Sequence, residues 1–349
     1  MRIVVTGASG NVGTSVLRAL IAEPKVESIL GIARRLPEWQ PEKVTWATAD
    51  VVGDPLEPHF RGADVVIHLA WAIQPSRDEV TTRRVNVTGS ERVFEASAEA
   101  GVGALVYASS IGAYSAGSQA ERVDESWPTG GIPTSFYSRH KALVETALDR
   151  FEADHPDVRV VRLRPALIFK GGSASEIRRL FGGPLVPGKL LEPDRLPVMP
   201  WISGLRTQAV HTDDVAEAYR LAAVGEASGA FNIAAEPVLD AKSVGEALGA
   251  RVVPLPGGMV RALAAGTWSA RLQPTPPGWV DMGRGVPLMD TSRARETLGW
   301  TPSHSSGEAL REVLSGMAGG EGERTPPLDP KAGGFMRIRE FLTGIGARN

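Results

Sequence analysis

Two residues that could move a proton stand four positions apart, Tyr137 and Lys141. In a helix this spacing places both side chains on one face. A phenol has a reference pKa of about 10, which is too high for proton transfer at neutral pH. An ammonium close by stabilises the phenolate and lowers that pKa, so the pair is typical of a tyrosine that exchanges a proton with a substrate oxygen. The same spacing also occurs on exposed helix surfaces, and the pair alone does not decide between these interpretations.

A pair of serines supports the catalytic interpretation. Ser109 and Ser110 end the apolar run ALVYASS, which begins at Ala104. If this run is a parallel strand, its last residues lie at the C-terminal edge of the sheet, where ligands of such sheets bind. A hydroxyl there can hydrogen-bond a substrate carbonyl beside the tyrosine. The alternative is that Ser110 caps the turn after the strand.

The segment TGASGNVG, from Thr6 to Gly13, lies between a β-branched run and a helical pattern. This context favours a dinucleotide-binding loop, in which Gly7 allows the tight turn, Gly10 admits a pyrophosphate and Gly13 lets the helix pack closely. The N-terminus of that helix offers free N–H groups and a partial positive charge to phosphates. The alternative is an ordinary turn. A P-loop is excluded because Thr14, not lysine, follows Gly13.

The end of the second apolar run predicts which nicotinamide cofactor is bound. An acidic residue about 20 positions past the glycines would bond the ribose 2′-hydroxyl of NAD. Ala33 stands there instead, followed by Arg34 and Arg35. Two guanidiniums without a carboxylate suit a 2′-phosphate, so NADP(H) is favoured and NAD(H) is the alternative. The arginines could also be solvated surface residues.

These residues need a scaffold, and the first half of the chain alternates between strand and helix patterns. We predict strands over 2–6, 28–33, 44–49, 63–70, 104–110 and 158–163, and helices over 11–22, 79–100 and 135–153. Continuous apolar strands between amphipathic helices indicate a parallel sheet covered on both faces. The predicted fold class is α/β, a doubly wound parallel sheet (Rossmann) with a smaller, chain-discontinuous substrate lobe.

The lobe is expected where this alternation weakens. We assign 1–165 and 210–234 to the dinucleotide-binding domain and 166–209 and 235–318 to the substrate lobe. Helical patterns are predicted near 175–181 and over 213–224, 241–248 and 291–298. Residues 319–349 are assigned to a linker and a C-terminal tail, because the segment from Gly319 to Gly334 is rich in glycine and proline and predicts flexibility.

Composition argues against several other functions. The formal net charge of −2 leaves no global field for a polyanion, so no nucleic-acid partner is expected. The chain has no cysteine and its six histidines lack metal-ligand spacing, so no metal is predicted. No apolar run approaches the roughly 20 residues of a membrane span, and the sequence opens on a strand rather than a signal peptide. We therefore expect a cytoplasmic protein without membrane contact that acts on a small molecule.

In their order along the chain, these segments resemble the extended short-chain dehydrogenase/reductases, the NAD-dependent epimerase/dehydratase family. Further matching segments are ATADVVGD with Asp50, HLA at His68–Ala70, VNVTGSERVFEAS with Asn86 and SSIGAY ending at Tyr114. RLRPALIF, AVHTDDVAEAY, FNIAAE and ARETLGWTP follow in the family's order. Many matching motifs in one order make the resemblance specific.

The resemblance implies an active site and a cofactor. Ser110, Tyr137 and Lys141 would form the catalytic triad, Asn86 would support it, and Lys141 would also hold the nicotinamide ribose. Hydride would pass between the nicotinamide and a substrate carbonyl or carbinol. A homodimer through helices 79–100 and 135–153 is also implied. The expected cofactor-binding residues are Gly7, Ser9, Gly10, Asn11, Val12, Gly13, Arg34, Arg35, Asp50, Val51, Leu69, Ala70, Trp71, Ala108, Ser109, Tyr137 and Lys141.

Departures from the family's pattern limit the substrate. Ile111 and Gly112 replace the Asp-Glu pair of the sugar dehydratases, which disfavours dehydration. Phe169-Lys170-Gly171 and Arg206-Thr207-Gln208 replace motifs typical of nucleotide-sugar enzymes. A ketoreductase, a dehydrogenase and an epimerase remain open. Candidate substrate residues are Gln74, Tyr114, Arg178 and Arg179, together with Trp71, Arg77 and Lys170; solvated surface is the alternative for each arginine, and His211 is expected to support a helix start.

The main alternative is a non-catalytic regulatory protein of the same fold that senses NADP(H). Such relatives commonly lack the tyrosine–lysine pair, whereas this chain keeps Ser110, Tyr137 and Lys141. An enzyme is therefore the favoured interpretation.

Overall fold

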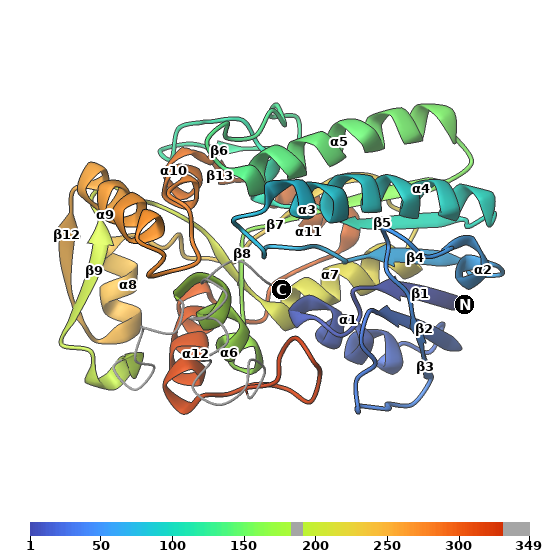
Figure 1. Cartoon of the computed structure of the whole chain (residues 1–349), viewed down its shortest axis with the longest axis horizontal. Helices are drawn as coiled ribbons and strands as arrows, with labels where there is room; N and C mark the ends of the chain where they lie inside the picture. Colours follow the sequence, from blue (N-terminus) through green and yellow to red (C-terminus); the bar gives the residue numbers. More distant parts are fainter. Residues whose placement is uncertain (183–190, 331–349) are drawn as a thin grey trace.

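A seven-stranded sheet forms the centre of the computed structural model, which describes residues 1–182 and 191–330 (Figure 1). The strand order is β11-β7-β5-β4-β1-β2-β3, and all neighbouring strands are parallel. The strands are β1 (Arg2–Thr6), β2 (Ser28–Ala33), β3 (Val44–Thr48), β4 (Val65–His68), β5 (Ala104–Ala108), β7 (Arg159–Pro165) and β11 (Gly229–Ile233). The predicted doubly wound α/β fold is confirmed.

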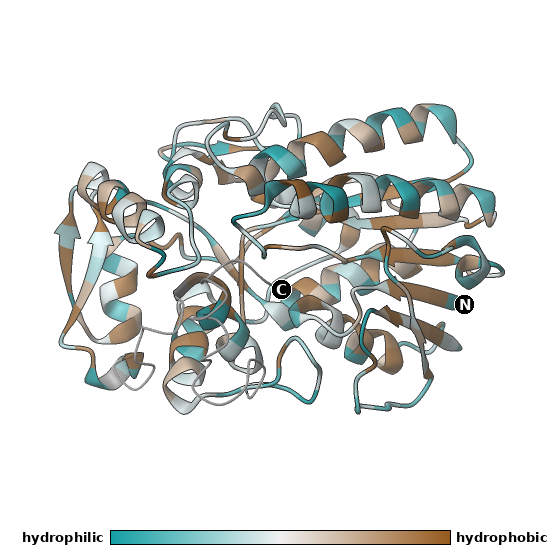
Figure 2. Ribbon diagram, viewed as in Figure 1, coloured by the Kyte–Doolittle hydropathy of each residue, from teal (hydrophilic) through white to brown (hydrophobic). Residues whose placement is uncertain are grey.

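Side chains from alternate positions of each strand enter two cores, one on each face of the sheet. Ile3 and Val5 of β1 pack in the core under α1 (Asn11–Ala22) and α7 (Thr212–Val224), whereas Val4 enters the core under α4 (Gly89–Glu99) and α5 (Phe136–Asp154). Because both faces are covered, most residues of β1, β2 and β4 are apolar, and Figure 2 shows these strands mainly in brown.

The remaining elements form short parallel pairs and helices beyond the C-terminal edge of the sheet (Figure 1). The pairs are β8 (Leu167–Phe169) with β10 (Ala209–His211), β9 (Val198–Ile202) with β12 (Arg251–Leu255), and β6 (Arg122–Val123) with β13 (Leu288–Met289). The helices are α6 (Ala174–Ile177), α8 (Ala241–Leu248), α9 (Gly257–Ser269), α10 (Gly278–Gly285) and α12 (Ser306–Gly319). In the Rossmann part lie α2 (Glu57–Phe60) and α11 (Ser292–Leu298), whose Ala294 and Leu298 join the core under α1 and α7.

Most predicted helices lie where the sequence placed them. The predicted helix over 79–100 consists of α3 (Glu79–Arg83), a π-helical turn η1 (Arg84–Thr88) and α4. The stretch predicted near 175–181 is α6 followed by another π-helical turn, η4 (Arg178–Gly182). Capping residues account for two ends: Asp240 and Ser305 each form a capping box, at the starts of α8 and α12.

The segment after α12 differs from the prediction of a flexible linker. Leu328 is fully buried and Thr325 is 2% exposed. The backbone N–H of Ser175 donates to the carbonyl of Glu321 at 3.2 Å, which ties the segment to α6. The linker prediction is wrong for 319–330, because apolar and charged side chains within the glycine-rich stretch find partners in the folded chain. The predicted tail lies outside the described residues.

Candidate active site

The glycine loop has the geometry that a dinucleotide requires. Gly7 has φ +71°, and a Cβ there would lie 2.7 Å from the backbone nitrogen of Ala70. A Cβ on Gly13 would lie 2.5 Å from the carbonyl oxygen of Gly7, so only glycine allows α1 to pack this closely. Gly10 caps α1 without a side-chain hydrogen bond, and a Cβ there would meet only the Gly7 oxygen, at 3.4 Å. The residues therefore fit a cofactor pyrophosphate at the start of α1.

The other loop residues position this turn. Ser9 is buried, and Asn11 accepts a hydrogen bond from the Thr212 hydroxyl at 3.2 Å. Val12 packs against the core beneath α1. Leu69 donates its backbone N–H to Thr6 at 3.0 Å, which joins the ends of β1 and β4 below the loop.

The residues predicted for the adenosine end lie at the ends of β2 and β3. Arg34 and Arg35 follow β2 and are exposed. Asp50 holds a turn, since its carboxylate accepts from the Val52 N–H at 2.9 Å. Val51 is buried and would touch a Cβ on Gly89 at 2.7 Å. The two exposed guanidiniums thus lie beside a fixed turn at the open edge of the sheet.

Ser110 and Tyr137 are joined by a side-chain hydrogen bond. Ser110 follows β5, and its oxygen also accepts from the Gly112 N–H at 3.0 Å. Tyr137 lies in the first turn of α5, which Ser135 caps. Burial raises the pKa of Tyr137, and the bond to Ser110 acts in the opposite direction. In the structure burial outweighs the lowering of this pKa that the sequence predicts, and it favours the protonated phenol.

Lys141 lies beside Tyr137 but makes its contacts elsewhere. Its Nζ donates to the Ala108 carbonyl at 2.5 Å and lies 3.5 Å from the Trp71 ring centroid and 5.8 Å from that of Tyr137. Within residues 1–182 and 191–330, no ion pair joins this ammonium to a carboxylate. Burial lowers the pKa of Lys141 well below its usual value, with Glu145 acting in the opposite direction. The cation is stabilised chiefly by an aromatic face and a carbonyl.

Asn86 supports the site through the backbone. It lies in the π-helical turn η1, fully buried, and accepts from the Ala72 N–H at 2.7 Å while donating to the Ala72 carbonyl at 2.8 Å. Asn86 therefore fixes the segment after β4 and, with it, the neighbouring Trp71. Its side chain contacts neither Tyr137 nor Lys141 in the described hydrogen bonds.

A buried ionic cluster lies behind the catalytic strand. Glu145 accepts from Ser109 and from two nitrogens of Arg164, each of the latter at 2.9 Å. Tyr114 donates to Asn232 at 2.6 Å and accepts from Arg164 at 3.1 Å, and burial raises its pKa to about 12. Tyr114 is fully buried in this cluster, so its assignment to the substrate site is wrong.

The polar residues predicted to face the substrate bond within the protein. Gln74 donates to the Leu180 carbonyl at 3.3 Å and is buried. Arg77 lies 3.6 Å from the Trp268 ring centroid and donates to its carbonyl. Arg179 donates to the Pro327 carbonyl, whereas Arg178 is partly exposed on η4. These residues tie the segments around the site together.

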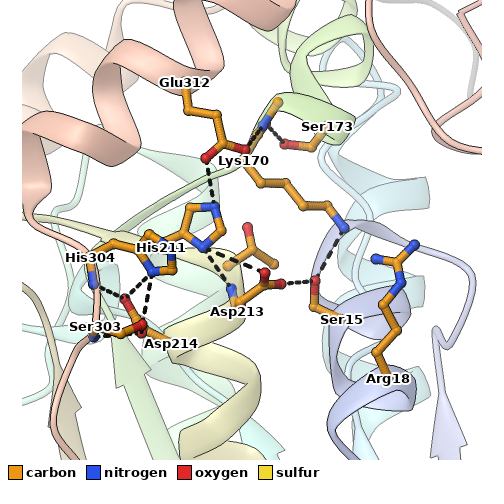
Figure 3. Close-up of polar contacts among 12 residues, drawn as sticks. Ser15, Arg18, Lys170, Ser173, His211, Asp213, Asp214, Ser303, His304 and Glu312 are labelled. Carbon is orange, nitrogen blue, oxygen red and sulfur yellow. Dashed lines mark hydrogen bonds and ion pairs between the residues drawn. The ribbon is translucent and has the colours of Figure 1, made fainter.

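Lys170 belongs to a polar network at the start of α1 (Figure 3). Its Nζ lies 2.8 Å from the Thr14 hydroxyl and 2.7 Å from Glu323, which also pairs with Arg18 at 2.7 Å. Ser15 donates to Asp213 at 2.7 Å and so joins α1 to α7. Lys170, a candidate substrate residue from the sequence, is therefore placed against the cofactor helix.

His211 extends this network toward α12, as Figure 3 shows. Its Nδ1 accepts from the Asp213 N–H at 3.2 Å, and its Nε2 lies 3.0 Å from Glu312. The ring centroid lies 4.1 Å from that of His304, which contacts Asp214. The predicted support of the α7 start by His211 is confirmed by its cap bond.

Aromatic residues around Tyr137 were only partly found from the sequence. The Tyr137 ring centroid lies 4.9 Å from that of Trp279 and 5.7 Å from that of Trp71. Phe181 packs at right angles on Trp279, at 4.9 Å. Trp71 was found because it follows HLA, whereas Trp279 and Phe181 carry no local signal. They come from α10 and η4, which the fold brings to the end of α5.

Known proteins resemble this chain in sequence and in fold. A model of the NAD dependent epimerase/dehydratase family matches residues 3–234, from β1 to the residue after β11. The chain belongs to this family. The family is described as one of NAD dependent epimerases and dehydratases.

Relatives within the family have different named activities. An uncharacterized protein of Mycobacterium tuberculosis is 28% identical over 330 residues, covering 93% of this chain, but the chain spans only 31% of that relative. The sterol-4-alpha-carboxylate 3-dehydrogenase (decarboxylating) of Saccharomyces cerevisiae is 29% identical and covers 49% of this chain and 52% of its own. A 4-hydroxy-2-methyl-3-oxo-4-farnesyl-3,4-dihydroquinoline-1-oxide ketoreductase of Stigmatella aurantiaca is 28% identical, with 64% of each chain covered.

Solved structures share the fold. The UDP-glucose 4-epimerase of Thermus thermophilus, solved with NAD, has a TM-score of 0.66 and 23% identity, covering 91% of this chain and 99% of its own.

None of the helices among the described residues has the length and apolar character that a bilayer span requires.

Proposed function

We propose that this enzyme reduces the carbonyl group of a small molecule with NADPH, using Ser110, Tyr137 and Lys141. The observation that carries the proposal is the Tyr137 phenol, bonded to Ser110 and kept protonated by burial. A protonated phenol beside a hydroxyl can bind a carbonyl oxygen and donate a proton to it as negative charge develops there.

Each residue has a distinct task in this proposal. Ser110 positions the substrate oxygen, and its bond to the Gly112 N–H orients the serine oxygen. Tyr137 gives its proton to that oxygen. Lys141, whose Nζ donates to the Ala108 carbonyl at the end of β5, would also donate to the nicotinamide ribose. The dinucleotide supplies the hydride when bound.

The preference for NADP(H) rests on the end of β2. Arg34 and Arg35 are exposed at the place where an acidic residue would select NAD, and their charges suit a 2′-phosphate. NAD(H) is the alternative. The small-molecule substrate, the homodimer and the cytoplasmic location remain predictions, and neither a nucleic acid nor a membrane is an expected partner.

The test is a fluorescence titration of the purified chain with NADPH and NADH, followed by assays with a carbonyl panel. We expect tighter binding of NADPH and its oxidation with at least one carbonyl. Tighter binding of NADH would contradict the assignment of Arg34 and Arg35. Cofactor binding without turnover of any carbonyl would favour the NADP(H)-sensing regulatory alternative.

A further inference from the structure

The proton donor lies among aromatic rings. Trp71 presents its edge to Tyr137 at 5.7 Å and an interplanar angle of 73°, and Trp279 lies against the same phenol at 4.9 Å and 37°. Phe181 packs edge-on against Trp279, and Phe136 lies 6.4 Å from it. We call Trp71, Phe136, Tyr137, Phe181 and Trp279 the aromatic cluster. Its spacings are those of favourable ring pairs.

This cluster is assembled from distant parts of the chain. Trp71 follows β4, Tyr137 belongs to α5, Phe181 to η4 and Trp279 to α10. Trp71, Tyr137, Phe181 and Trp279 are all partly exposed. A ligand can therefore reach these rings without unfolding a core.

Polar groups around the cluster are occupied by the protein itself. Gln74 donates to backbone carbonyls, and Arg77 is stacked on Trp268. Lys170, which could have met a phosphate, pairs with Glu323 at 2.7 Å. The Nε1 atom of Trp71 is buried without a hydrogen-bond partner among the described residues. The indole N–H is therefore an unpaired donor on the ring that Lys141 contacts. A diphosphate would find most of the nearby cations engaged, whereas an apolar ring would find uncovered aromatic surface.

We infer that the substrate is an uncharged, largely apolar cyclic ketone whose ring packs against Trp71 and Trp279 while its oxygen meets Ser110 and Tyr137. The inference rests on the proposed function. The carbonyl carbon gains a hydride with its electron pair from NADPH, which becomes NADP⁺. The oxygen takes the π electron pair and the Tyr137 proton to give an alcohol, and the phenolate regains a proton from water.

The probes are 2-tetralone, a bicyclic apolar ketone, with NADPH, and UDP-glucose with NADP⁺. We expect a higher kcat/KM for 2-tetralone. Trp279→Leu should raise its KM about tenfold with kcat changed less than about threefold, because it removes an aromatic face but no reacting group. Trp279→Phe should restore most of the affinity. Trp201→Leu is the matched control, since Trp201 lies in β9 and donates to the Leu205 carbonyl, and it should leave KM unchanged.

Binding separates the inference from the proposed function. If NADPH binds but neither probe is turned over, the proposed carbonyl reduction is contradicted for both probes. The inferred binding of an apolar ketone is then tested separately, by the change in melting temperature that 2-tetralone causes in the NADP⁺ complex. A shift that is present in the wild type and Trp201→Leu, but lost in Trp279→Leu, supports it. Absence of any shift overturns it. A preference for UDP-glucose that is lost in Arg178→Ala would overturn the inference while leaving the oxidoreductase intact.

Discussion

Two buried lysines lie at the C-terminal edge of the sheet, and their surroundings differ. Lys141 is 3% exposed and Lys170 is 4% exposed. Burial lowers the pKa of both, but Lys170 has the Glu323 carboxylate at 2.7 Å, whereas Lys141 has an indole face and a backbone carbonyl. A buried ammonium with a carboxylate partner keeps its charge and contributes to stability. The pKa of a buried ammonium without such a partner can still be shifted by its surroundings.

The two regions around these lysines differ in the same way. The network at α1 joins oppositely charged groups from α1, the β8–α6 connection and the segment after α12. The catalytic end is aromatic, with uncharged hydrogen bonds between Ser110 and Tyr137 and between Asn86 and Ala72. We therefore expect substitutions in the first region to change stability and those in the second to change chemistry.

The largest expected effect is that of Tyr137→Phe. Loss of the proton donor should reduce kcat by about 10²–10⁴-fold, the usual contribution of general acid catalysis. Affinity for NADPH, measured by fluorescence titration, should stay within about threefold because the cofactor loop is untouched. Retention of more than a tenth of the wild-type kcat would contradict the assigned role.

Glu323→Gln should act on stability instead. Lys170 would stay buried without its partner, and removal of one member of a buried pair costs about 3–5 kcal/mol; we expect about 3 kcal/mol, because Glu323 retains 16% exposure. Urea unfolding measures the change. Combining Lys170→Met with Glu323→Leu should recover most of the loss.

Lys141→Met breaks no ion pair and should leave the free energy of unfolding equal or higher. If Glu323→Gln and Lys141→Met lowered the free energy of unfolding equally, the idea that Lys170 serves stability and Lys141 does not would be contradicted.

Arg34→Ala combined with Arg35→Ala should weaken NADPH binding. Hydrogen bonds to charged groups contribute about 1.5–3 kcal/mol, so we expect about a ten- to hundredfold rise in the Kd of NADPH and little change for NADH. Parallel titrations of the variant and the wild type measure both. Equal weakening for the two cofactors would show that the arginines do not read the 2′-phosphate.

His68→Gln should change the pH dependence of stability. Burial lowers the pKa of His68 to about 3, from about 6.5 in the unfolded chain. Between about pH 3 and 6.5 the His68 ring is protonated in the unfolded chain but not in the folded one, so wild-type stability falls as the pH drops below about 6.5. Above about pH 6.5 the ring is neutral in both states, and His68 adds no pH dependence to the free energy of unfolding. The difference in slope from the variant should approach about 1.4 kcal/mol per pH unit at the acid end of urea unfolding experiments between pH 7.5 and 5. Parallel slopes would contradict a neutral buried His68.

Sequence reasoning succeeded where short segments determine the structure. The turn at Gly7 and the close packing at Gly13 are local requirements, and the structure confirms both. The strand pattern predicted the sheet because apolar runs of this length between helices have few other arrangements. The likeness to the family supplied Ser110, whose bond to Tyr137 the structure shows.

Sequence reasoning failed where partners come from distant segments. Nothing around Trp279 indicates that it meets Tyr137, and nothing around Glu323 indicates that it meets Lys170. The glycines and prolines near Glu323 suggested a linker, although long-range ion pairs and the buried Leu328 hold the segment in place. Tyr114 was misplaced because it follows a short 3-10 turn, η2 (Ile111–Ala113), and the local sequence does not show whether its side chain faces inward.

The pair between Arg18 and Glu323 joins residues 305 positions apart. At about 5–20 residues per second, the ribosome makes the second partner roughly 15–60 s after the first. The nascent chain can form β1, β2 and α1 early, but Lys170 lacks its carboxylate partner until Glu323 has been made. The contacts of the segment after α12 with the cofactor-binding end of the molecule therefore form only after all strands of the sheet have been synthesised.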